Sequence, residues 1–270
     1  NVLSDRNVAI GSYSLASHTQ GSSIDSYNVA IGFEAGLQVT TGIQNTLMGG
    51  LSGDAITTGN YNLAIGHQAL SSNTTADYNV AVGRNALYTN ILGGRSTAIG
   101  ISALETQNPA SAADMYNVAV GYNAGAAVTT GINNTLIGGL AGDAITTGGD
   151  NTAVGTLALS SNTAATSNVA VGKDALLDFN VTSSTATYNT AVGHHAGRLV
   201  STGVENTIIG GLAGDASTTA SYNTLIGSIA GSTLTTGGEN VAVGRAALFA
   251  GTTGTQNVAV GTSALDANTT

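Results

Sequence analysis

A five-residue pattern, N-x-x-x-G, recurs along the whole 270-residue chain and constrains its fold more than any other feature. Its fifteen copies start at residues 7, 28, 45, 62, 79, 96, 117, 134, 151, 168, 189, 206, 223, 240 and 257, and only Ser96 replaces the Asn. The starts of successive copies differ by 17, except in three long units, starting at 7, 96 and 168, where they differ by 21. A short, fixed period is typical of a solenoid, in which each repeat packs only against its neighbours.

The composition of each unit favours short strands over helices. If the first residue of the pattern is position 0, position 3 is always aliphatic or Met, position 4 is always Gly and position 7 is always Ala or Ser. Such pentads, separated by Gly, Ser, Thr and Asn, are typical of strands joined by turns, and a unit of this length allows two short strands per coil. We therefore predict an all-β fold, a parallel β-solenoid of fifteen coils forming one repeat domain over residues 1–270. The first Asn of each coil is expected to stack in a hydrogen-bonded ladder.

Positions 8 and 11 vary together, which indicates that their side chains share one space. Position 8 is Gly in seven units and Leu in eight. In six of the seven Gly units position 11 is aliphatic, whereas the Leu units carry Asn, Gly, His, Gln or Phe there. Because protein interiors are close-packed, we infer that the core of each coil is filled by one side chain or the other. The aliphatic residues are Val39, Ile56, Val128, Ile145, Val200 and Leu234, and Ser217 is the exception.

Position 2 points to the opposite side of the strand from positions 1 and 3, because side chains alternate along a strand. If positions 1 and 3 face the core, position 2 faces outward, yet it is Ala in eleven units and a large aliphatic residue in four. A continuous apolar stripe of this kind exceeds what a soluble monomer exposes. We therefore predict that identical copies of the chain cover it, with Leu47, Leu136, Ile208 and Leu225 as interface residues.

The low content of charge argues against several classes of function. Only 8% of the residues are charged, and six Lys and Arg in a chain of net charge −9 leave little to neutralise phosphates, so we expect no nucleic-acid partner. No run of eighteen apolar residues is present, and we expect no membrane insertion by this segment. The chain has no Cys for disulfide bonds or thiolate metal sites.

The pentads NVAIG (7 and 28) and NVAVG (79, 117, 168, 240 and 257), each followed after two intervening residues by Ala or Ser, resemble the YadA-like head repeats of trimeric autotransporter adhesins. YNVAVGYNAG at 116–125 and NTAVGTLAL at 151–159 are also similar to repeats of phage tail fibres. The resemblance implies a left-handed parallel β-roll and a homotrimer. It also implies an extracellular location, at the cell surface or on a virion, and it carries over no catalytic residue.

The resemblance leaves the adhesin and the phage fibre as alternatives. The period of 17 is longer than the usual head repeat, and the chain contains neither an outer-membrane anchor nor a coiled-coil stalk. It stops at Thr270, four residues short of the next expected pentad, so we expect a segment of a longer protein. In either case the expected function is to present a binding surface to a receptor, protein or glycan, on a cell or another solid target.

Two groups of residues have side chains of the kinds that metal ions prefer, but we expect no metal site at either. GGLAGDAIT at 138–146 nearly matches the calcium-binding nonapeptide, and the corresponding acids are Asp54, Asp143 and Asp215. Calcium-binding rolls need this phrase in tandem, whereas these three acids are separated by several units each, and the Gly-plus-aliphatic core explains the same letters. The adjacent His194 and His195 are the other candidate, although position 5 also carries Arg and Lys and therefore indicates an exposed turn.

The sequence predicts no enzyme and no cofactor. Its fifteen acidic residues are scattered over the units without a recurrent close pair of the kind that glycosidases use. It has no G-x-S-x-G nucleophile motif, no P-loop and no dinucleotide-binding fingerprint.

Ice binding is the alternative function from another class. Adjacent Thr pairs recur at positions 12 and 13, and a solenoid could present one Thr of each pair as a flat ladder. Against this, alternation sends the two side chains to opposite faces, and the long units interrupt the ladder. The pairs start at Thr40, Thr57, Thr74, Thr129, Thr146, Thr218, Thr235 and Thr252.

The three long units are the predicted sites of recognition. Their four extra residues fall within Ala16–Tyr27, Glu105–Tyr116 and Leu177–Tyr188. A coil cannot absorb four residues without losing register, so we expect outward loops, which on a rigid scaffold often carry binding residues. Each loop returns to a Tyr just before the next Asn, and Tyr27, Tyr116 and Tyr188 are therefore the candidate contact residues.

Overall fold

The computed structural model describes residues 6–19 and 25–269 of the chain. The described residues form strands and turns, and none of them forms a helix that is long and apolar enough to cross a membrane. The chain divides into two compact units, residues 1–133 and residues 134–270, and both consist of stacked coils. Part of the first long loop, residues 20–24, lies outside the described residues.

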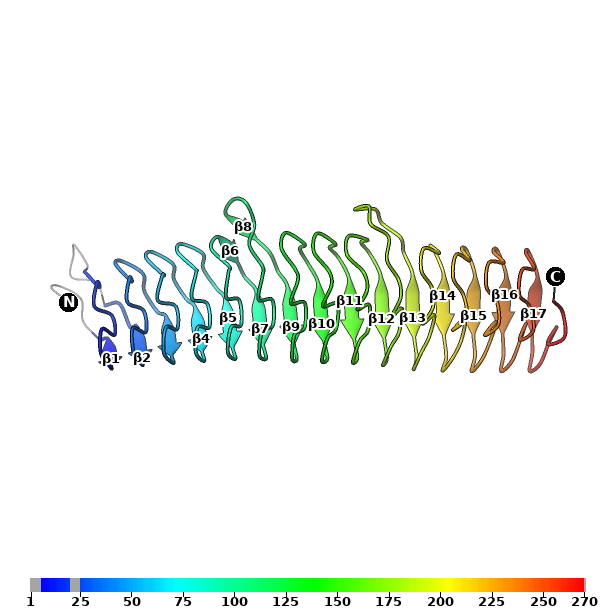
Figure 1. The fold of residues 1–270 in the computed structure, drawn as a ribbon, viewed down its shortest axis with the longest axis horizontal. Coiled ribbons are helices and arrows are strands. Elements are labelled where there is room, and N and C mark those ends of the chain that lie inside the picture. The colour runs from blue at the N-terminus through cyan, green and yellow to red at the C-terminus, as the bar shows by residue number, and fades with distance from the viewer. Residues whose placement is uncertain (1–5, 20–24, 270) are drawn as a thin grey trace. The chain divides into compact units, whose positions relative to one another are not determined.

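In the first unit each coil contributes one three-residue strand to a parallel sheet (Figure 1). Residues at the same position of neighbouring coils pair directly, as Val29 does with Thr46. A second sheet of two parallel strands, β6 (Gly93–Gly94) and β8 (Ala113–Asp114), joins the second long loop to the coil before it. The strands of the main sheet are β1 (Val8–Ile10), β2 (Val29–Ile31), β3 (Thr46–Met48), β4 (Leu63–Ile65), β5 (Val80–Val82), β7 (Thr97–Ile99) and β9 (Val118–Val120).

The second unit repeats this arrangement, with one strand from each coil in a parallel sheet. A single parallel bridge between Thr166 and Ala186 holds the third long loop. The predicted β-solenoid is therefore confirmed, but among the described residues only the coils that contain β6 and β8 have a second strand. The strands are β10 (Thr135–Ile137), β11 (Thr152–Val154), β12 (Val169–Val171), β13 (Thr190–Val192), β14 (Thr207–Ile209), β15 (Thr224–Ile226), β16 (Val241–Val243) and β17 (Val258–Val260).

Turns whose backbone groups bond to the neighbouring coils replace the second strand. The nitrogen of Leu70, at position 8, donates to the carbonyl of Ala86 in the next coil at 2.9 Å. Leu70 has a φ of 55°, a left-handed conformation that costs an L-residue about 1–2 kcal/mol. Its side chain is fully buried, which contributes roughly 1.5–3 kcal/mol and offsets that cost.

The invariant Gly at position 4 allows successive coils to approach each other closely. Gly32 has a φ of +141°, and a Cβ there would lie 2.5 Å from the carbonyl oxygen of Gly49, the equivalent residue of the next coil. The same near-contact recurs at most of the other position-4 glycines, for example between Gly193 and Gly210 at 2.6 Å. Any side chain at this position would push the coils apart, which explains why the pattern always ends in Gly.

The Asn residues at position 0 form the predicted ladder. The backbone nitrogen of Asn45 donates to Oδ1 of Asn28 in the coil before it at 2.9 Å, and Nδ2 of Asn45 donates to the same atom at 3.3 Å. Nδ2 of Asn45 also donates to the carbonyl of Gly59, near the end of its own coil, at 2.8 Å. In the second unit Asn206 makes the same contacts with Asn189 and with the carbonyl of Ala220. Both side chains of the first example are buried, so the ladder lies inside the coil.

Gln107 repairs the one break in the ladder, at Ser96. The backbone nitrogen of Ser96 still donates to Oδ1 of Asn79 at 3.0 Å, but a serine has no amide for the following coil. Oε1 of Gln107, from position 11 of the same coil, accepts a hydrogen bond from Nδ2 of Asn117 at 2.9 Å, and its Nε2 donates to the Ser96 hydroxyl at 3.0 Å. The glutamine therefore supplies the amide that this coil otherwise lacks.

Position 2 lies inside the coil, and the prediction that it forms an interface between chains is wrong. Leu47, Leu136 and Leu225 are 0% exposed and Ile208 is 1% exposed within a single chain. Positions 1 and 3 face outward instead, and Met48 at position 3 is 38% exposed. The pentad is apolar on both faces, so alternation alone did not distinguish inside from outside.

Leu47, Ile208 and Leu225 at position 2 each fill a space beside position 8 in their own coil and in the coil before. A Cβ on Gly53, in the same coil as Leu47, would lie 2.8 Å from Leu47 Cδ2 and 2.8 Å from Ile56 Cδ1. A Cβ on Gly36, one coil earlier, would lie 2.7 Å from Leu47 Cδ1. The seven units with Gly at position 8 are the units that contain a large residue at position 2 or directly precede one. Positions 8 and 11 do share a space, and position 2 shares it with them.

This rule also explains why Ser217 departs from the aliphatic pattern at position 11. Ser217 and Gly214 belong to the same coil. This coil has a large position-2 residue, Ile208, and the next coil has one too, Leu225. A Cβ on Gly214 would lie 2.8 Å from Leu225 Cδ1 and 3.4 Å from Ile208 Cδ1. The two side chains fill the space, so a small residue suffices at position 217.

Coils with Leu at position 8 and Asn at position 11 use position 11 differently. Leu159 is fully buried and takes the apolar space, while Asn162 closes the following turn. Oδ1 of Asn162 accepts a hydrogen bond from the nitrogen of Ala165, and its Nδ2 donates to the carbonyl of Ala165, both at 3.0 Å. The two kinds of coil therefore differ in side chains and keep the same backbone path.

A double-mutant cycle at Ala153 and Leu159 tests this packing rule. Ala153→Leu alone should destabilise the chain, because the new side chain meets Leu159, and Leu159→Gly alone should cost about 2–5 kcal/mol by leaving a cavity. Together they should be less destabilising than the sum of the two, because Leu159→Gly removes the side chain that the new Leu meets. Urea unfolding of the four proteins measures the coupling, and simple additivity would show that positions 2 and 8 are independent.

Candidate functional site

Three exposed side chains stack at the ends of successive coils in the first unit. Tyr61 and Tyr78 are the last residues of their coils, and their rings lie parallel with centroids 4.9 Å apart. The guanidinium carbon of Arg95, the last residue of the next coil, lies 4.7 Å from the centre of the Tyr78 ring. All three have a φ between 58° and 61°, which directs equivalent side chains the same way from each coil. The stack holds Arg95 by a cation–π contact.

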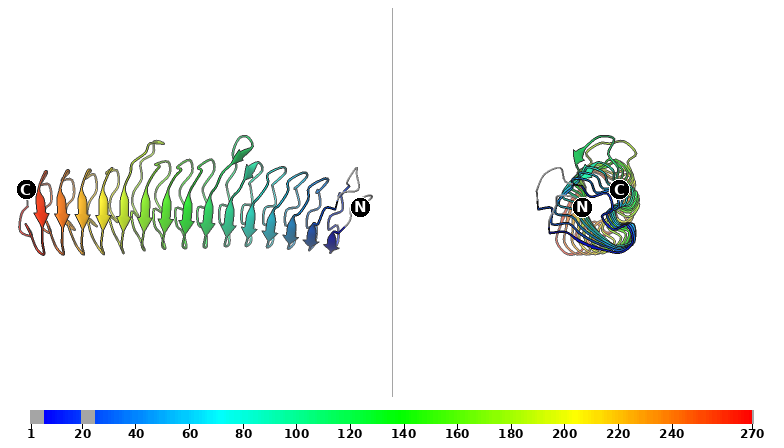
Figure 2. Two further views of the ribbon diagram at one scale, coloured as in Figure 1. Left: turned by 180° about the vertical axis from the view of Figure 1, so that it is seen from behind. Right: turned by 90° about the vertical axis from the view of Figure 1, so that its left-hand side faces the viewer.

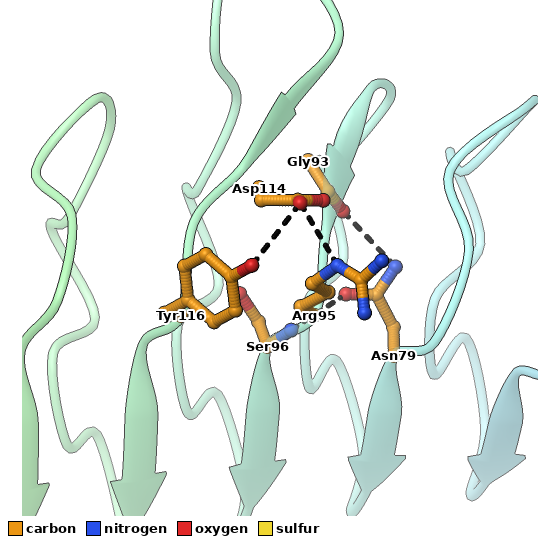
Figure 3. A network of polar contacts seen from close by, with 6 residues as sticks. All are labelled: Asn79, Gly93, Arg95, Ser96, Asp114 and Tyr116. Carbon is orange, nitrogen blue, oxygen red and sulfur yellow. Dashed lines mark hydrogen bonds and ion pairs between the residues drawn. The ribbon is translucent and has the colours of Figure 1, made fainter.

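The second long loop is fastened to this stack by Asp114, on β8. Nε of Arg95 lies 2.8 Å from Oδ2 of Asp114, and the hydroxyl of Tyr116 donates to the same oxygen at 3.2 Å (Figure 3). The pairing of β6 with β8 adds backbone contacts at the same place. Arg95 and Asp114 are both about half exposed, so the arrangement is open to solvent.

The first long loop has the same fastening, and the third does not. Arg6 and Asp25 form an ion pair of 2.6 Å, and the Tyr27 hydroxyl donates to Asp25 at 3.3 Å. The residues equivalent to Arg95 and Asp114 in the third long coil are Ser167 and Ala186, so the charged pair cannot form there. Each of the first two long coils therefore combines an Arg just before its first residue with D-x-Y at its end.

An open hollow of about 370 Å³ lies beside the second long loop. Its charged groups are Asp77, Arg95 and Asp114, Tyr78 also lines it, and its apolar residues include Leu92 and Ala112. Asp77 is fixed by the preceding coil, because its Oδ1 accepts hydrogen bonds from the nitrogen and Nδ2 of Asn60 at 2.6 and 3.2 Å. The remaining lining residues are Thr75, Ala76, Gly94 and Ala113.

The long loops extend outward where the structure describes them. The second loop, with β8, projects beyond the neighbouring coils in both views of Figure 2, and residues 110–114 are exposed. Residues 182–186 of the third loop are also exposed. Tyr27, Tyr116 and Tyr188 are 45%, 54% and 62% exposed, as the prediction of a contact surface requires. Their role in binding stays a prediction.

The acids of the calcium-like phrase take part in contacts between coils. Oδ1 of Asp54 accepts a hydrogen bond from the hydroxyl of Ser71 in the next coil at 2.6 Å, and Asp143 accepts one from Ser160 at the same distance. Burial raises the pKa of Asp215, and a backbone hydrogen bond and the charge of Arg198 oppose this only in part. In the part of the chain that the structure describes, no three His, Asp or Glu side chains are grouped so that they could hold a metal ion.

The two histidines stack on each other, and His195 binds a buried carboxylate. The rings of His194 and His195 have centroids 3.7 Å apart, and Nε2 of His195 lies 2.9 Å from Oδ2 of Asp174. Lys173 Nζ lies 2.8 Å from the same oxygen. Burial acts to raise the pKa of Asp174, but the hydrogen bonds and charges of Lys173 and His195 together outweigh it, and the pKa lies below its ordinary value. This group joins two coils electrostatically.

The first Thr of seven of the eight pairs donates its hydroxyl to the next coil. Oγ1 of Thr40 donates to the carbonyl of Thr57 at 3.1 Å, and Oγ1 of Thr218 does the same to Thr235 at 3.1 Å. The second Thr of these pairs is exposed. The exposed row is short in the first unit, because Leu92 follows Thr41, Thr58 and Thr75 at this position.

No family model, no curated protein and no solved structure matches this chain. The candidate site is therefore the open polar hollow lined by Asp77 and Asp114, beside the anchored second long loop. Sequence analysis identified Tyr116 in this group but missed Tyr61, Tyr78 and Arg95. Their shared place at the end of three successive coils is the signal that could have found them.

The pH dependence of stability should depend on Asp174. Because its folded pKa lies below the ordinary value of 3.8, its contribution to stability is complete above pH 3.8 and is lost as the pH falls through the folded pKa. Asp174→Asn is a fair comparison, since Asn tolerates the φ of 57° at this position. The difference in the free energy of unfolding between wild type and variant should shrink below pH 3.8, and a difference that grew on acidification would contradict the assignment.

Proposed function

We propose that this chain is a structural and adhesive segment of an extracellular homotrimeric fibre, either an adhesin head or part of a phage tail fibre. The observation that carries the proposal is the outer face of the parallel sheet in each unit. Position 3 on this face is Val, Ile or Met in every coil, position 1 is Val, Leu or Thr, and neither position is charged in any coil. Such a stripe is larger than the apolar patches that soluble monomers usually leave in water.

A second copy of the same chain is the occupant that this face fits best. The apolar residues repeat once per coil, at the strand separation of about 4.8 Å. Only a partner with the same repeat distance can contact every coil in the same way, and another copy has that distance by construction. Packing sheet face on sheet face would also bury Thr side chains at position 1, whose hydroxyls can hydrogen-bond across the interface.

The binding surface in this proposal consists of the long loops, which leave the coil while the sheet face packs against the other chains. Two of them are fastened at their base by an Arg–Asp pair and a Tyr, so they start from a defined geometry. Three chains would present each loop three times, and weak contacts could add through multivalency. The receptor, protein or glycan, would lie on a cell or another solid target.

Ile99 and Ile101 provide a matched pair of variants for the proposed trimer. They lie two residues apart, and both are apolar and exposed, at 40% and 48%. Ile99 is on the outer sheet face at position 3, whereas Ile101 is at position 5 on the following turn. Ile99→Lys should convert the trimer to monomers, because it places like charges in an apolar interface, and Ile101→Lys should leave the trimer intact.

Sedimentation and light scattering of the folded proteins measure this difference, with circular dichroism as the check of folding. A wild-type chain that is monomeric at all concentrations would refute the proposed assembly. An Ile99→Lys chain that stays trimeric would remove the sheet face from the interface.

A further inference from the structure

The hollow beside the second long loop contains hydrogen-bond donors and acceptors, with two negatively charged groups and one positively charged group. Asp77 and Asp114 supply carboxylate oxygens, and Arg95 supplies a guanidinium that is paired with Asp114. The contacts of these groups with the rest of the chain use Nε of Arg95, Oδ2 of Asp114 and Oδ1 of Asp77. The terminal nitrogens of the guanidinium and the second oxygen of each carboxylate therefore remain to bind a ligand in the hollow.

This combination favours one class of ligand. A metal ion lacks a site, because no three His, Asp or Glu side chains of the described residues are grouped so that they could hold one, and an anion would be repelled by two carboxylates. A sugar ring carries hydroxyl groups that each donate and accept, so it can pair with the guanidinium fork and with the carboxylates at once. Its C–H face would lie against the apolar wall of Leu92 and Ala112.

The size and rigidity of the hollow fit the same class. Its volume of about 370 Å³ is near the lower end for small-molecule sites, which run from about 300 to 1,000 Å³. Arg95 is held on one side by the Tyr78 ring and on the other by Asp114, so its guanidinium needs little ordering on binding.

We infer that this hollow is a subsite for one neutral monosaccharide unit of a glycan. The inference rests on the proposed function for the source of the sugar, which is a receptor glycan on the target surface. It goes beyond that function by naming the residues and the ligand class. Arg95 donates to adjacent sugar hydroxyls, Asp77 and Asp114 accept from them, and Ala112 and Leu92 contact the ring.

An array of immobilised neutral and acidic oligosaccharides tests the inference, followed by an NMR titration with the free monosaccharide that ends the best-bound glycan. Wild type should bind neutral glycans. Ala112→Trp places a large side chain in the hollow and should weaken binding at least tenfold. Arg95→Lys keeps the charge but loses the planar fork, and it should weaken binding as well.

Ala110→Trp is the matched control. Ala110 is exposed on the same loop, two residues from Ala112, and does not line the hollow, so this variant should bind like wild type. A wild-type chain that binds no neutral glycan, or binding that Ala112→Trp leaves unchanged, would overturn the inference. Preferential binding of acidic glycans or of peptides would overturn it too.

Failure of the inference can be separated from failure of the proposed function. A trimer that attaches to cells equally well with and without Ala112→Trp would remove this subsite and leave the proposed function standing. A chain that stays monomeric and still binds neutral glycans through the hollow would refute the proposed assembly and support the subsite.

Discussion

The buried side-chain amide at the start of each coil is the interaction on which the rest of the structure depends. In one example, Oδ1 of Asn28 accepts a hydrogen bond from the backbone nitrogen of Asn45 in the next coil. Nδ2 of Asn45 closes its own coil by donating a hydrogen bond to the carbonyl of Gly59. A buried backbone group without a partner is costly, so each amide satisfies groups that the short strand leaves open. The same residue therefore sets both the closure of a coil and its distance from the next. Gly at position 4 makes that short distance sterically possible.

The period, the all-β class, the parallel pairing and the ladder could be predicted from the sequence, because each follows from residues that repeat at the same position. The inside of the coil could not be predicted from alternation, because the pentad is apolar on both faces. The sizes of the residues at positions 2 and 8 do distinguish the inside from the outside. Position 2 is mostly Ala, and where it is large, as at Leu47, position 8 is Gly in that coil and in the coil before. A residue whose size is compensated elsewhere lies in a confined space, and Leu47 is fully buried.

The candidate site was predictable only in part for a related reason. The outward course of the long loops follows from their four extra residues, and Tyr116 was found because it ends such a loop. The contact of Arg95 with Tyr78 depends on stacking, which makes residues at the same position of successive coils into neighbours. The acids at positions 54 and 143 looked like metal ligands in the sequence, but stacking gives each of them a serine partner in the next coil. In a solenoid, a site should therefore be sought among residues that occupy the same position in successive coils.

The ladder can be tested most directly where the chain itself has replaced one of its members. Gln107→Ala should cost about 1–3 kcal/mol in urea unfolding, because Asn117 and Ser96 lose a buried hydrogen-bond partner. Adding Ser96→Asn should recover most of that loss by restoring the usual amide at position 0. If Gln107→Ala has no effect, or if Ser96→Asn recovers nothing in its presence, the amide ladder is not what holds the coils together.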